Sequence, residues 1–394
     1  MNTIRNAAVF FMMMLIFALP TDGAAEVAGM SLVKIAGLMA FGLMLVLMVM
    51  GAELTAAPAL HIPILLYVAW MILSYTWSEM PIPYESEQVA GGYQQAVKSN
   101  LYVLMIALLL FQLAKTEKHI QMLSLAFILG DLWLVYLMVK DYQIGGTTVR
   151  QEIKDFDANE VAVKLAMAMP MAIYLFTVAR HWALRGVAVL YLPLAMFTIL
   201  ITGSRTGAVT MLLGLTGLWP LIRNAGVLGK LAAGVTAVVL IVGAANVVPQ
   251  QTIERIFSTG KEISQGTLNE RSVIWGYAYE EWKQSPLVGH GLSSFRRVIN
   301  QYNVKYTAHN SFVSIAAEQG IIGVLFYVSV IGVSFVYAFF LPPLERLLML
   351  SMLGIIFLGQ MSLTIHDRMH VWFAYSLPVL ITYIQRGSST LISK

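Results

Sequence analysis

Long apolar segments recur along nearly the whole of this chain, and they constrain its fold more than any other feature. Of its 394 residues, 58% are hydrophobic and 12% are charged. Soluble domains carry roughly a quarter charged residues, and apolar runs of about 18 residues or more are typical of membrane-spanning helices. The sequence therefore predicts an all-α integral membrane protein.

We expect about twelve membrane helices in a single polytopic domain that covers residues 1–394. They lie near Ala7–Pro20, Ser31–Gly51, His61–Trp77, Lys98–Ala114, His119–Lys140, Glu160–Ala179, Ala183–Ile201, Arg205–Ile222, Val227–Val248, Asn310–Phe340, Leu344–Thr364 and Val371–Gln385. We expect the first to be a retained helix rather than a cleaved signal peptide. The longest polar stretch, residues 249–308, is expected to form a loop between the ninth and tenth helices.

The distribution of Lys and Arg predicts the orientation, because these residues are enriched in cytoplasmic loops. With the N-terminus inside, ten Lys and Arg fall in the inner segments: Arg5, Lys115, Lys118, Arg180, Arg185, Arg223, Lys230, Arg346, Arg386 and Lys394. Both termini are therefore expected to be cytoplasmic. Residues 141–159 and 249–308 and the turns at Arg205 and Arg368 then share the outer side. The net charge of +4 follows this pattern, so we expect membrane lipids and no nucleic acid as partners. Cys is absent, which excludes disulfides and thiolate metal sites.

His309 stands where the long loop meets the tenth helix. Asn310 follows it, and nine residues separate Asn310 from Gly320, with Gly323 beyond. On a continuous helix, Ala316 and both glycines lie within about 40° of the histidine, which predicts a face of small residues below it. An imidazole with a pKa near 6.5 can take a proton from an attacking hydroxyl. The alternative is a histidine that only caps or anchors the helix at the membrane boundary.

Arg205 is a candidate for binding an anion. It follows Gly203, which can end one helix in a left-handed conformation, and Ser204, which can cap the next. Free backbone N–H groups at a helix start, together with a guanidinium, suit a phosphate group. The alternative is an arginine that reaches lipid headgroups.

Arg271 is expected in the first turn of a helix inside the long loop, because Thr267–Glu270 fits a capping box. Trp275, Tyr279 and Trp282 follow as an aromatic stripe, which would contact lipid headgroups or stack on sugar rings. His290, which lies between two glycines, is expected to have a structural role.

Charged residues also mark another outer segment. Asp155 and Asp157 have an Asp-x-Asp spacing that suits a metal ion, although Asp157 is equally placed to cap the sixth helix. We favour the cap. Arg150 and Lys154 in the same segment can help to hold an anionic substrate.

One further segment and two single residues carry charged or titratable side chains. Residues 366–370 (His-Asp-Arg-Met-His) predict a local ion pair rather than a set of metal ligands. Asp131 and Lys164 lie within or near apolar helices, where charges are costly. The sequence leaves open whether they pair with each other.

These segments resemble motifs of the O-antigen ligase family of bacterial outer-envelope biogenesis. The resemblance rests on Thr202–Gly207, Arg271 with Trp275, Pro286–Gly291, and His309-Asn310-x9-Gly320-x-x-Gly323. It implies a membrane glycosyltransferase of the C type in the bacterial inner membrane. Such an enzyme moves an O-antigen polysaccharide from undecaprenyl pyrophosphate to a sugar hydroxyl of lipid A–core, on the periplasmic side. The family needs neither a metal ion nor a nucleotide cofactor.

The residues and the resemblance together predict the site. His309 is expected to be the general base, and Arg205 and Arg271 are expected to bind the pyrophosphate. Further substrate contacts are expected from four residues: Asn310, Arg150, Lys154 and Arg368.

Other functions remain open. O-antigen polymerases and protein O-oligosaccharyltransferases belong to the same superfamily, and polymerases tend to carry Arg-x15-Gly motifs in two sizeable outer loops. Here Leu221 and Leu287 stand sixteen residues after Arg205 and Arg271, which favours the ligase. A transporter of lipid-linked glycan would instead have discontinuous helices and polar groups near the membrane midplane. A structural scaffold would tolerate replacement of His309 and both arginines.

Overall fold

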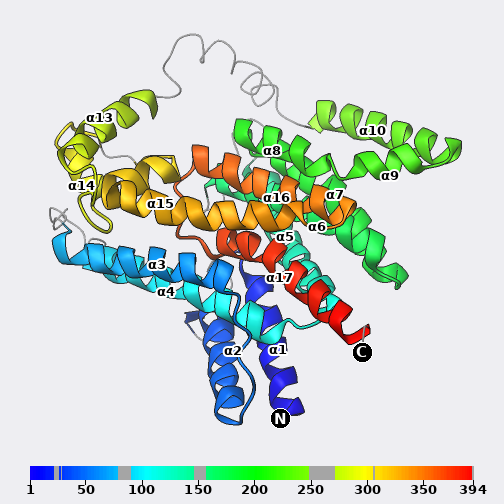
Figure 1. The fold of residues 1–394 in the computed structure, drawn as a ribbon. Coiled ribbons are helices and arrows are strands. Elements are labelled where there is room, and N and C mark those ends of the chain that lie inside the picture. The colour runs from blue at the N-terminus through cyan, green and yellow to red at the C-terminus, as the bar shows by residue number, and fades with distance from the viewer. Residues whose placement is uncertain are drawn as a thin grey trace.

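The computed structural model describes residues 1–21, 26–27, 29–78, 90–145, 157–247, 271–304 and 307–392, and these are almost entirely helical (Figure 1). The helices are α1 (Asn2–Ala18), α2 (Leu32–Val49), α3 (Pro58–Ser74), the 3₁₀ helix η1 (Tyr75–Trp77), α4 (Ala90–Leu113), α5 (Glu117–Gly145), α6 (Ala158–Val178), α7 (Trp182–Ile201), α8 (Arg205–Leu215), α9 (Leu218–Asn224), α10 (Val227–Val247), α13 (Arg271–Gln284), α14 (Phe295–Asn300), α15 (Ser311–Phe339), α16 (Pro343–Ser362) and α17 (Met369–Ile392). Two short antiparallel strands, β1 (Glu26–Val27) and β2 (Met30–Ser31), pair Glu26 with Ser31. The all-α prediction is confirmed apart from this hairpin.

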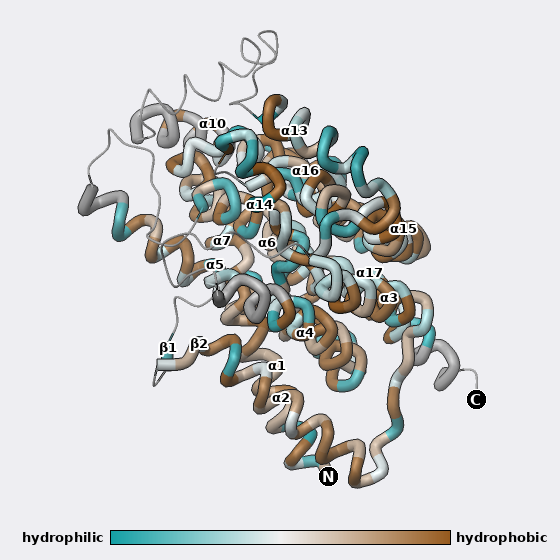
Figure 2. Tube along the Cα trace, turned by 90° about the vertical axis from the view of Figure 1, so that its left-hand side faces the viewer, coloured by the Kyte–Doolittle hydropathy of each residue, from teal (hydrophilic) through white to brown (hydrophobic). Residues whose placement is uncertain are grey.

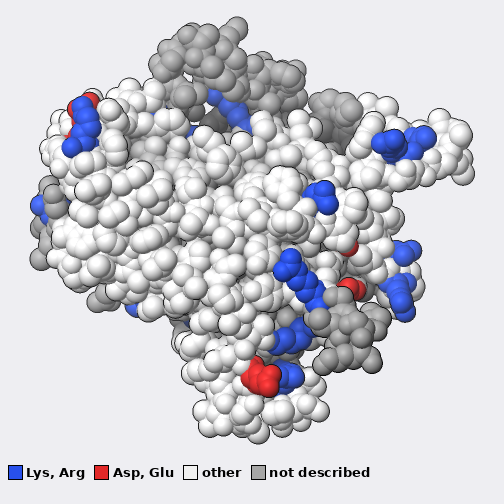
Figure 3. Space-filling view, in the orientation of Figure 1, with Lys and Arg blue, Asp and Glu red and all other residues white. Residues whose placement is uncertain are grey.

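The expected membrane helices are all helical, although the eighth is divided at residues 216–217 into α8 and α9. In the described part of the chain, seven helices are long and apolar enough to span a membrane: Leu32–Val49, Pro58–Trp77, Glu117–Asp141, Ala158–Val178, Trp182–Ile201, Ser311–Phe339 and Pro343–Ser362. Figure 3 shows a broad uncharged surface over α3 and α15, as contact with lipid tails requires. The hydropathy of the chain in Figure 2 agrees, since α15 is mostly hydrophobic whereas α13 carries several hydrophilic turns. The chain is therefore a multi-pass membrane protein.

Helix α6 forms the centre of the bundle, with 83% of its span buried. It packs against α5, α7, α8 and α16. Small residues allow its close approach to α8, because a Cβ atom added at Gly207 would lie 2.5 Å from the Cβ of Ala162. Close contact between small residues is a common basis of helix association in membranes.

Asp131 and Lys164 are both buried, and the structure gives them different partners. The Tyr191 hydroxyl donates a hydrogen bond to Asp131 Oδ2 at 2.9 Å and lies 2.7 Å from the Leu165 carbonyl oxygen. Lys164 Nζ lies 2.9 Å from Glu160 Oε1, one helical turn away on α6. Each charge therefore meets a polar group within the protein instead of facing lipid.

Helix α15 is broken at Gly320, which has φ 62° and ψ −168°. The loop between α13 and α14 crosses α15 at this point. A Cβ atom at Gly320 would lie 2.2 Å from the Leu287 carbonyl oxygen, and one at Gly289 would lie 2.4 Å from the Gln319 nitrogen. Only glycine allows two backbones to approach this closely.

The loop also supplies the hydrogen bonds that the break removes from α15. The N–H groups of Ile321 and Ile322 donate to the carbonyl oxygens of Pro286 and Leu287, at 2.9 and 3.3 Å. In return, two loop N–H groups donate to helix carbonyl oxygens: His290 to Ala317 at 3.0 Å, and Gly291 to Glu318 at 2.7 Å. Non-helical backbone at membrane depth is tolerated where other protein groups satisfy it. The loop and the broken helix therefore stabilise each other.

Two expectations about this region were wrong. The tenth helix is not continuous from residue 310 to 340, because Gly320 interrupts it. His309 is not on the helix either, because α15 begins at Ser311. A helix wheel through His309, Ala316 and Gly323 therefore does not describe a single face, and the glycines serve contact with the loop.

Replacing Gly320 by Ala is expected to destabilise the protein by about 1–3 kcal/mol, because the left-handed backbone is strained with a side chain and the added carbon overlaps the loop. Gly332→Ala on the same helix is the matched control, since no atom lies within 4 Å of a Cβ there. Thermal unfolding in detergent would measure both. Equal melting temperatures for the two variants would contradict the proposed interlock.

Candidate functional site

His309 lies at the end of the loop that leads into α15, and its backbone has φ 45°. This left-handed conformation is uncommon outside glycine, although His, Asn and Asp adopt it more often than other residues. Asn310 then caps α15, because its Oδ1 accepts hydrogen bonds from the N–H groups of Phe312 and Val313 at 2.9 and 3.1 Å. The amide oxygen of Asn310 is therefore engaged by the helix start, and His309 is left half-buried beside it.

The His309 side chain lines a cavity of about 390 Å³. Distant parts of the chain contribute the other charged and titratable walls, among them Asp157, Glu160, Arg296, Glu318, His366 and Arg368. Ligand sites in proteins are typically cavities of about 300–1,000 Å³. All these residues lie near helix ends that the alternation of helices predicts to share one side of the membrane. The structure brings these ends together into one polar cavity.

Helix α13 is attached beside His309. Trp275 Nε1 donates a hydrogen bond to the carbonyl oxygen of Ala308 at 2.8 Å. Arg271 precedes Trp275 by four residues, so both side chains lie on the same face of α13. Burial lowers the pKa of His309 below its ordinary value of 6.5, the positive charge of Arg271 lowers it further, and the negative charge of Asp157 opposes both effects. His309 is therefore a neutral imidazole at pH 7, able to accept a proton.

The turn before α8 has the predicted conformation. Gly203 has φ 61°, and the Ser204 hydroxyl caps α8 by accepting a hydrogen bond from the Gly207 N–H at 2.9 Å. Gly207 packs against Ala162, one turn from the start of α6. Arg205 therefore lies in the first turn of a helix that flanks the α6 wall of the cavity. In the described part of the chain, the cavity wall itself contains neither Arg205 nor Arg271.

Glu160 connects α6 to the turn before α17. Besides its contact with Lys164, its carboxylate lies 3.8 Å from Arg368 Nη2. The expectation of a local ion pair within residues 366–370 was therefore wrong, because Arg368 reaches across to another helix. This long-range contact fixes one wall of the cavity.

Several residues of the cavity were not predicted as part of the site, among them Glu318 and His366. Glu318 accepts hydrogen bonds from the N–H groups of Ser293 and Phe295, both at 3.2 Å. A carboxylate inside an apolar segment was the available signal. His366 is buried, and burial lowers its pKa below 6.5. Its neighbour across the turn is Trp372, whose Nε1 donates to the His366 carbonyl oxygen at 2.7 Å.

The other predicted residues have varied outcomes. Asp157 caps α6, because its Oδ1 accepts hydrogen bonds from the N–H groups of Asn159 and Glu160 at 2.7 and 3.4 Å. The other predictions in this segment, Arg150, Lys154 and Asp155, lie outside the described residues, as does the capping box at residues 267–270. Among the residues that are described, no three His, Asp or Glu side chains form a group suited to a metal ion.

The aromatic residues of the stripe on α13 lie in two different environments. Trp275 is fixed to the protein, whereas Tyr279 is 56% exposed and stacks on Trp282 with ring centroids 5.8 Å apart. His290 hydrogen-bonds through Nε2 to the Glu281 carbonyl oxygen at 3.0 Å. His290 therefore stabilises the loop, as expected.

Residues 190–328 match the family described as O-Antigen ligase. We call residues 190–328 the O-antigen ligase segment. The comparison of the whole chain with curated proteins gives no match. The O-antigen ligase segment contains Arg205, Arg271 and His309, together with the broken part of α15. Members of this family are ligases and polymerases of the glycosyltransferase type, and the match supports an enzyme of that broad class.

The O-antigen ligase segment alone does not complete the cavity. Asp157 and Glu160 precede it, and Arg368 follows it by forty residues (368 − 328). The walls from α6 and from the turn before α17 are therefore contributed by the rest of the chain.

The opposing charges around His309 predict the direction in which two substitutions shift its pKa. Arg271→Gln should raise the pKa of His309 toward 6.5, and Asp157→Asn should lower it further. Asn is as good a helix cap as Asp, so Asp157→Asn retains the start of α6. Titration of labelled histidine by NMR, assigned with a His309→Asn spectrum, would measure both shifts. Shifts in the same direction would contradict the arrangement described.

Proposed function

We propose that the chain is an O-antigen ligase that transfers O-antigen polysaccharide from undecaprenyl pyrophosphate to a sugar hydroxyl of lipid A–core. The pyrophosphate already activates the anomeric carbon, so the enzyme has two tasks. It must remove a proton from the acceptor hydroxyl, and it must stabilise the charge on the departing pyrophosphate. The acceptor oxygen attacks opposite the leaving group and inverts the anomeric centre.

The position of His309 is the observation that carries this proposal. Its imidazole lines a polar cavity beside the start of α15, and its lowered pKa leaves it unprotonated at neutral pH. A base in this state accepts the hydroxyl proton as the new glycosidic bond forms. Its backbone is held on one side by the Asn310 cap and on the other by the Trp275 hydrogen bond to Ala308. The ring therefore has a defined position.

Arg205 and Arg271 are the proposed ligands of the pyrophosphate. They come from the first turns of α8 and α13, where the helix dipole also favours an anion. Arginine binds phosphate oxygens in pairs through its planar fork. Arg368, which lies in the cavity wall, is proposed as a further contact, and Arg150, Lys154 and Asn310 remain lower-ranked candidates.

The proposed location is the bacterial inner membrane, with both termini in the cytoplasm and the cavity facing the periplasm. The bias of Lys and Arg toward one set of loops supports this orientation. The polar residues of the cavity also lie at helix ends that share the opposite side. A periplasmic site is where a lipid-linked polysaccharide and lipid A–core would meet.

The break in α15 at Gly320 raises the question of transport, because broken helices are a feature of transporters. In transporters, the free ends of such half-helices contact the substrate. Here the loop of residues 286–291 binds the N–H and carbonyl groups at the break. The broken helix therefore supports an enzyme with a fixed loop better than a transport path.

Replacing His309 by Asn should reduce the rate of transfer by about 10²–10⁴-fold, because Asn tolerates the left-handed backbone but cannot act as the base. The assay uses purified protein, lipid-linked glycan and lipid A–core, with product mass as the readout. His181→Asn is the control, because His181 caps α7 and accepts a hydrogen bond from the Ala183 N–H, a role that Asn can retain. Near-normal transfer by a folded His309→Asn protein would exclude the base.

The same assay separates the related functions. A glycan joined to lipid A–core identifies a ligase, a lengthened lipid-linked glycan identifies a polymerase, and a glycosylated protein identifies a protein transferase. We expect EDTA to leave the rate unchanged. Loss of activity with EDTA and recovery with a divalent cation would contradict the metal-independent mechanism.

The pH dependence follows from the state of His309. Protonated imidazole cannot accept a proton, so kcat/KM should fall about tenfold per pH unit once the pH drops below the pKa of His309. Because burial and Arg271 lower that pKa, the midpoint of this fall should lie below pH 6.5. A midpoint above pH 7 in rate measurements would indicate a different titrating group.

A further inference from the structure

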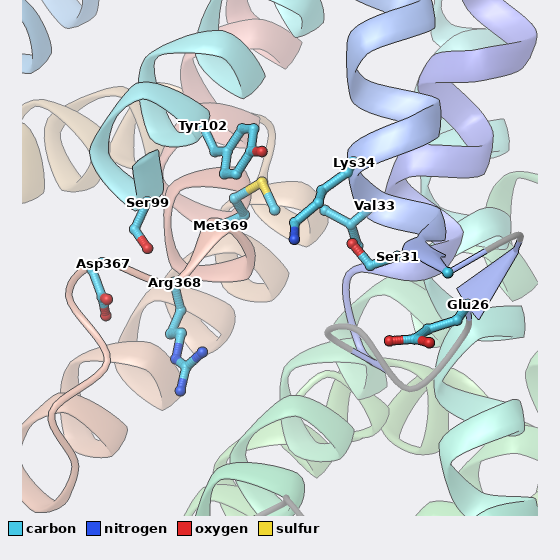
Figure 4. A pocket seen from close by; sticks show the side chains of 10 residues that line it. Glu26, Ser31, Val33, Lys34, Ser99, Tyr102, Asp367, Arg368 and Met369 are labelled. Carbon is cyan, nitrogen blue, oxygen red and sulfur yellow. The ribbon is translucent and has the colours of Figure 1, made fainter. Parts of the chain in front are cut away.

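A second polar cavity, of about 300 Å³, adjoins the cavity that contains His309. Figure 4 shows Lys34 and Glu26 on one side, and Ser99, Asp367 and Arg368 on the other. The described walls are completed by Gly29, Ser31, Val33, Tyr102 and Met369. Asp367 and Arg368 line both cavities. The turn before α17 is therefore a common wall between them.

The chemistry of the second cavity suits a hydroxyl-rich and uncharged ligand. Its two acidic and two basic side chains balance in charge, so the walls do not select strongly for an anion. Ser31, Ser99 and Tyr102 add hydroxyl groups that both donate and accept hydrogen bonds. Tyr102 and Met369 lie together in Figure 4 and add an aromatic ring and an apolar surface. Sugar rings present hydroxyl groups at their edges and C–H groups on their faces, which matches this combination.

The position of the second cavity relates it to one substrate. Helix α13, which begins at Arg271, lies in the upper part of the molecule in Figures 1 and 2, whereas α2 lies in the lower part. The cavity of His309 is lined by Leu292, Ser293 and Arg296 from the α13–α14 side, and it shares Asp367 and Arg368 with the second cavity. If the pyrophosphate is bound on the side of α13, an attacking hydroxyl must arrive from the other side of the anomeric carbon. The second cavity is lined by residues of α2, α4 and the turn before α17 and by none of the described residues of α13 or α14, so it lies on that side.

We propose that the cavity between α2, α4 and the turn before α17 binds a sugar of the acceptor glycolipid. Lys34, Glu26, Ser99 and Tyr102 hold its hydroxyl groups, and the ring that carries the attacking hydroxyl extends past Arg368 toward His309. This inference rests on the proposed function and adds the place where the second substrate binds. It also assigns a role to α2 and α4, which lie outside the O-antigen ligase segment.

The test compares the acceptor and donor kinetics of two variants. Lys34→Gln removes a charged donor, and Tyr102→Phe removes a single hydroxyl. Each should raise the KM for lipid A–core, by about tenfold for Lys34→Gln and several-fold for Tyr102→Phe. The KM for lipid-linked glycan and the kcat at saturating acceptor should stay near wild-type values. Lys230→Gln on α10 and Tyr136→Phe on α5 are matched controls, because both residues are away from the two cavities.

A direct binding measurement distinguishes failure of this inference from failure of the proposed function. Thermal shift of the purified protein is recorded with lipid A–core lacking O-antigen, in the absence of donor. Stabilisation of wild type that is weakened in Lys34→Gln supports the acceptor site, even if no transfer product forms. Equal stabilisation of both proteins, or an increase in the KM for donor instead of acceptor, would overturn it. Absence of any transfer by wild type, with acceptor binding intact, would count against the ligase activity alone.

Discussion

The mutual pairing between the loop of residues 286–291 and the broken helix α15 is the constraint on which the rest of the site depends. Polar backbone inside a membrane protein must be hydrogen-bonded by protein groups. At Gly320 this requirement is met by four backbone hydrogen bonds to a single loop. The loop joins α13 to α14, so its attachment also fixes both of these helices. Arg271 and Trp275 are thereby placed relative to His309.

The cavity illustrates how a multi-pass membrane protein can build a polar site from short segments. Most contributing segments are helix ends or turns, where backbone and side-chain polar groups are not yet committed to the helix. Asp157, Ser204 and Asn310 use their side chains to cap α6, α8 and α15. The caps set where each helix begins. The positions of Glu160, Arg205 and His309 follow from those starting points.

Local features of this arrangement were predictable from the sequence, and contacts between distant segments were not. The caps at Asp157 and Ser204 and the left-handed Gly203 follow from residue types next to apolar runs, and all three are present. Gly320 gave no such signal, because a glycine within a long apolar run is compatible with a continuous helix. Its break depends on a loop some thirty residues earlier in the chain. The contact of Arg368 with Glu160 could not be predicted from sequence spacing either, because the two residues are 208 positions apart (368 − 160).

The bond from Trp275 to the carbonyl oxygen of Ala308 has a consequence for how the site can evolve. It joins the residue before His309 to the helix that carries Arg271. The histidine and the arginine therefore belong to one structural unit, in which their relative positions are held by this bond. A change in the lipid-facing helices alters the surroundings of this unit without altering its internal spacing. An insertion of one residue between Arg271 and Trp275 would rotate the arginine by about 100° around α13. Substitutions elsewhere in the bundle therefore leave the spacing of Arg271 and His309 unchanged, whereas a change in the length of the four-residue interval on α13 alters it.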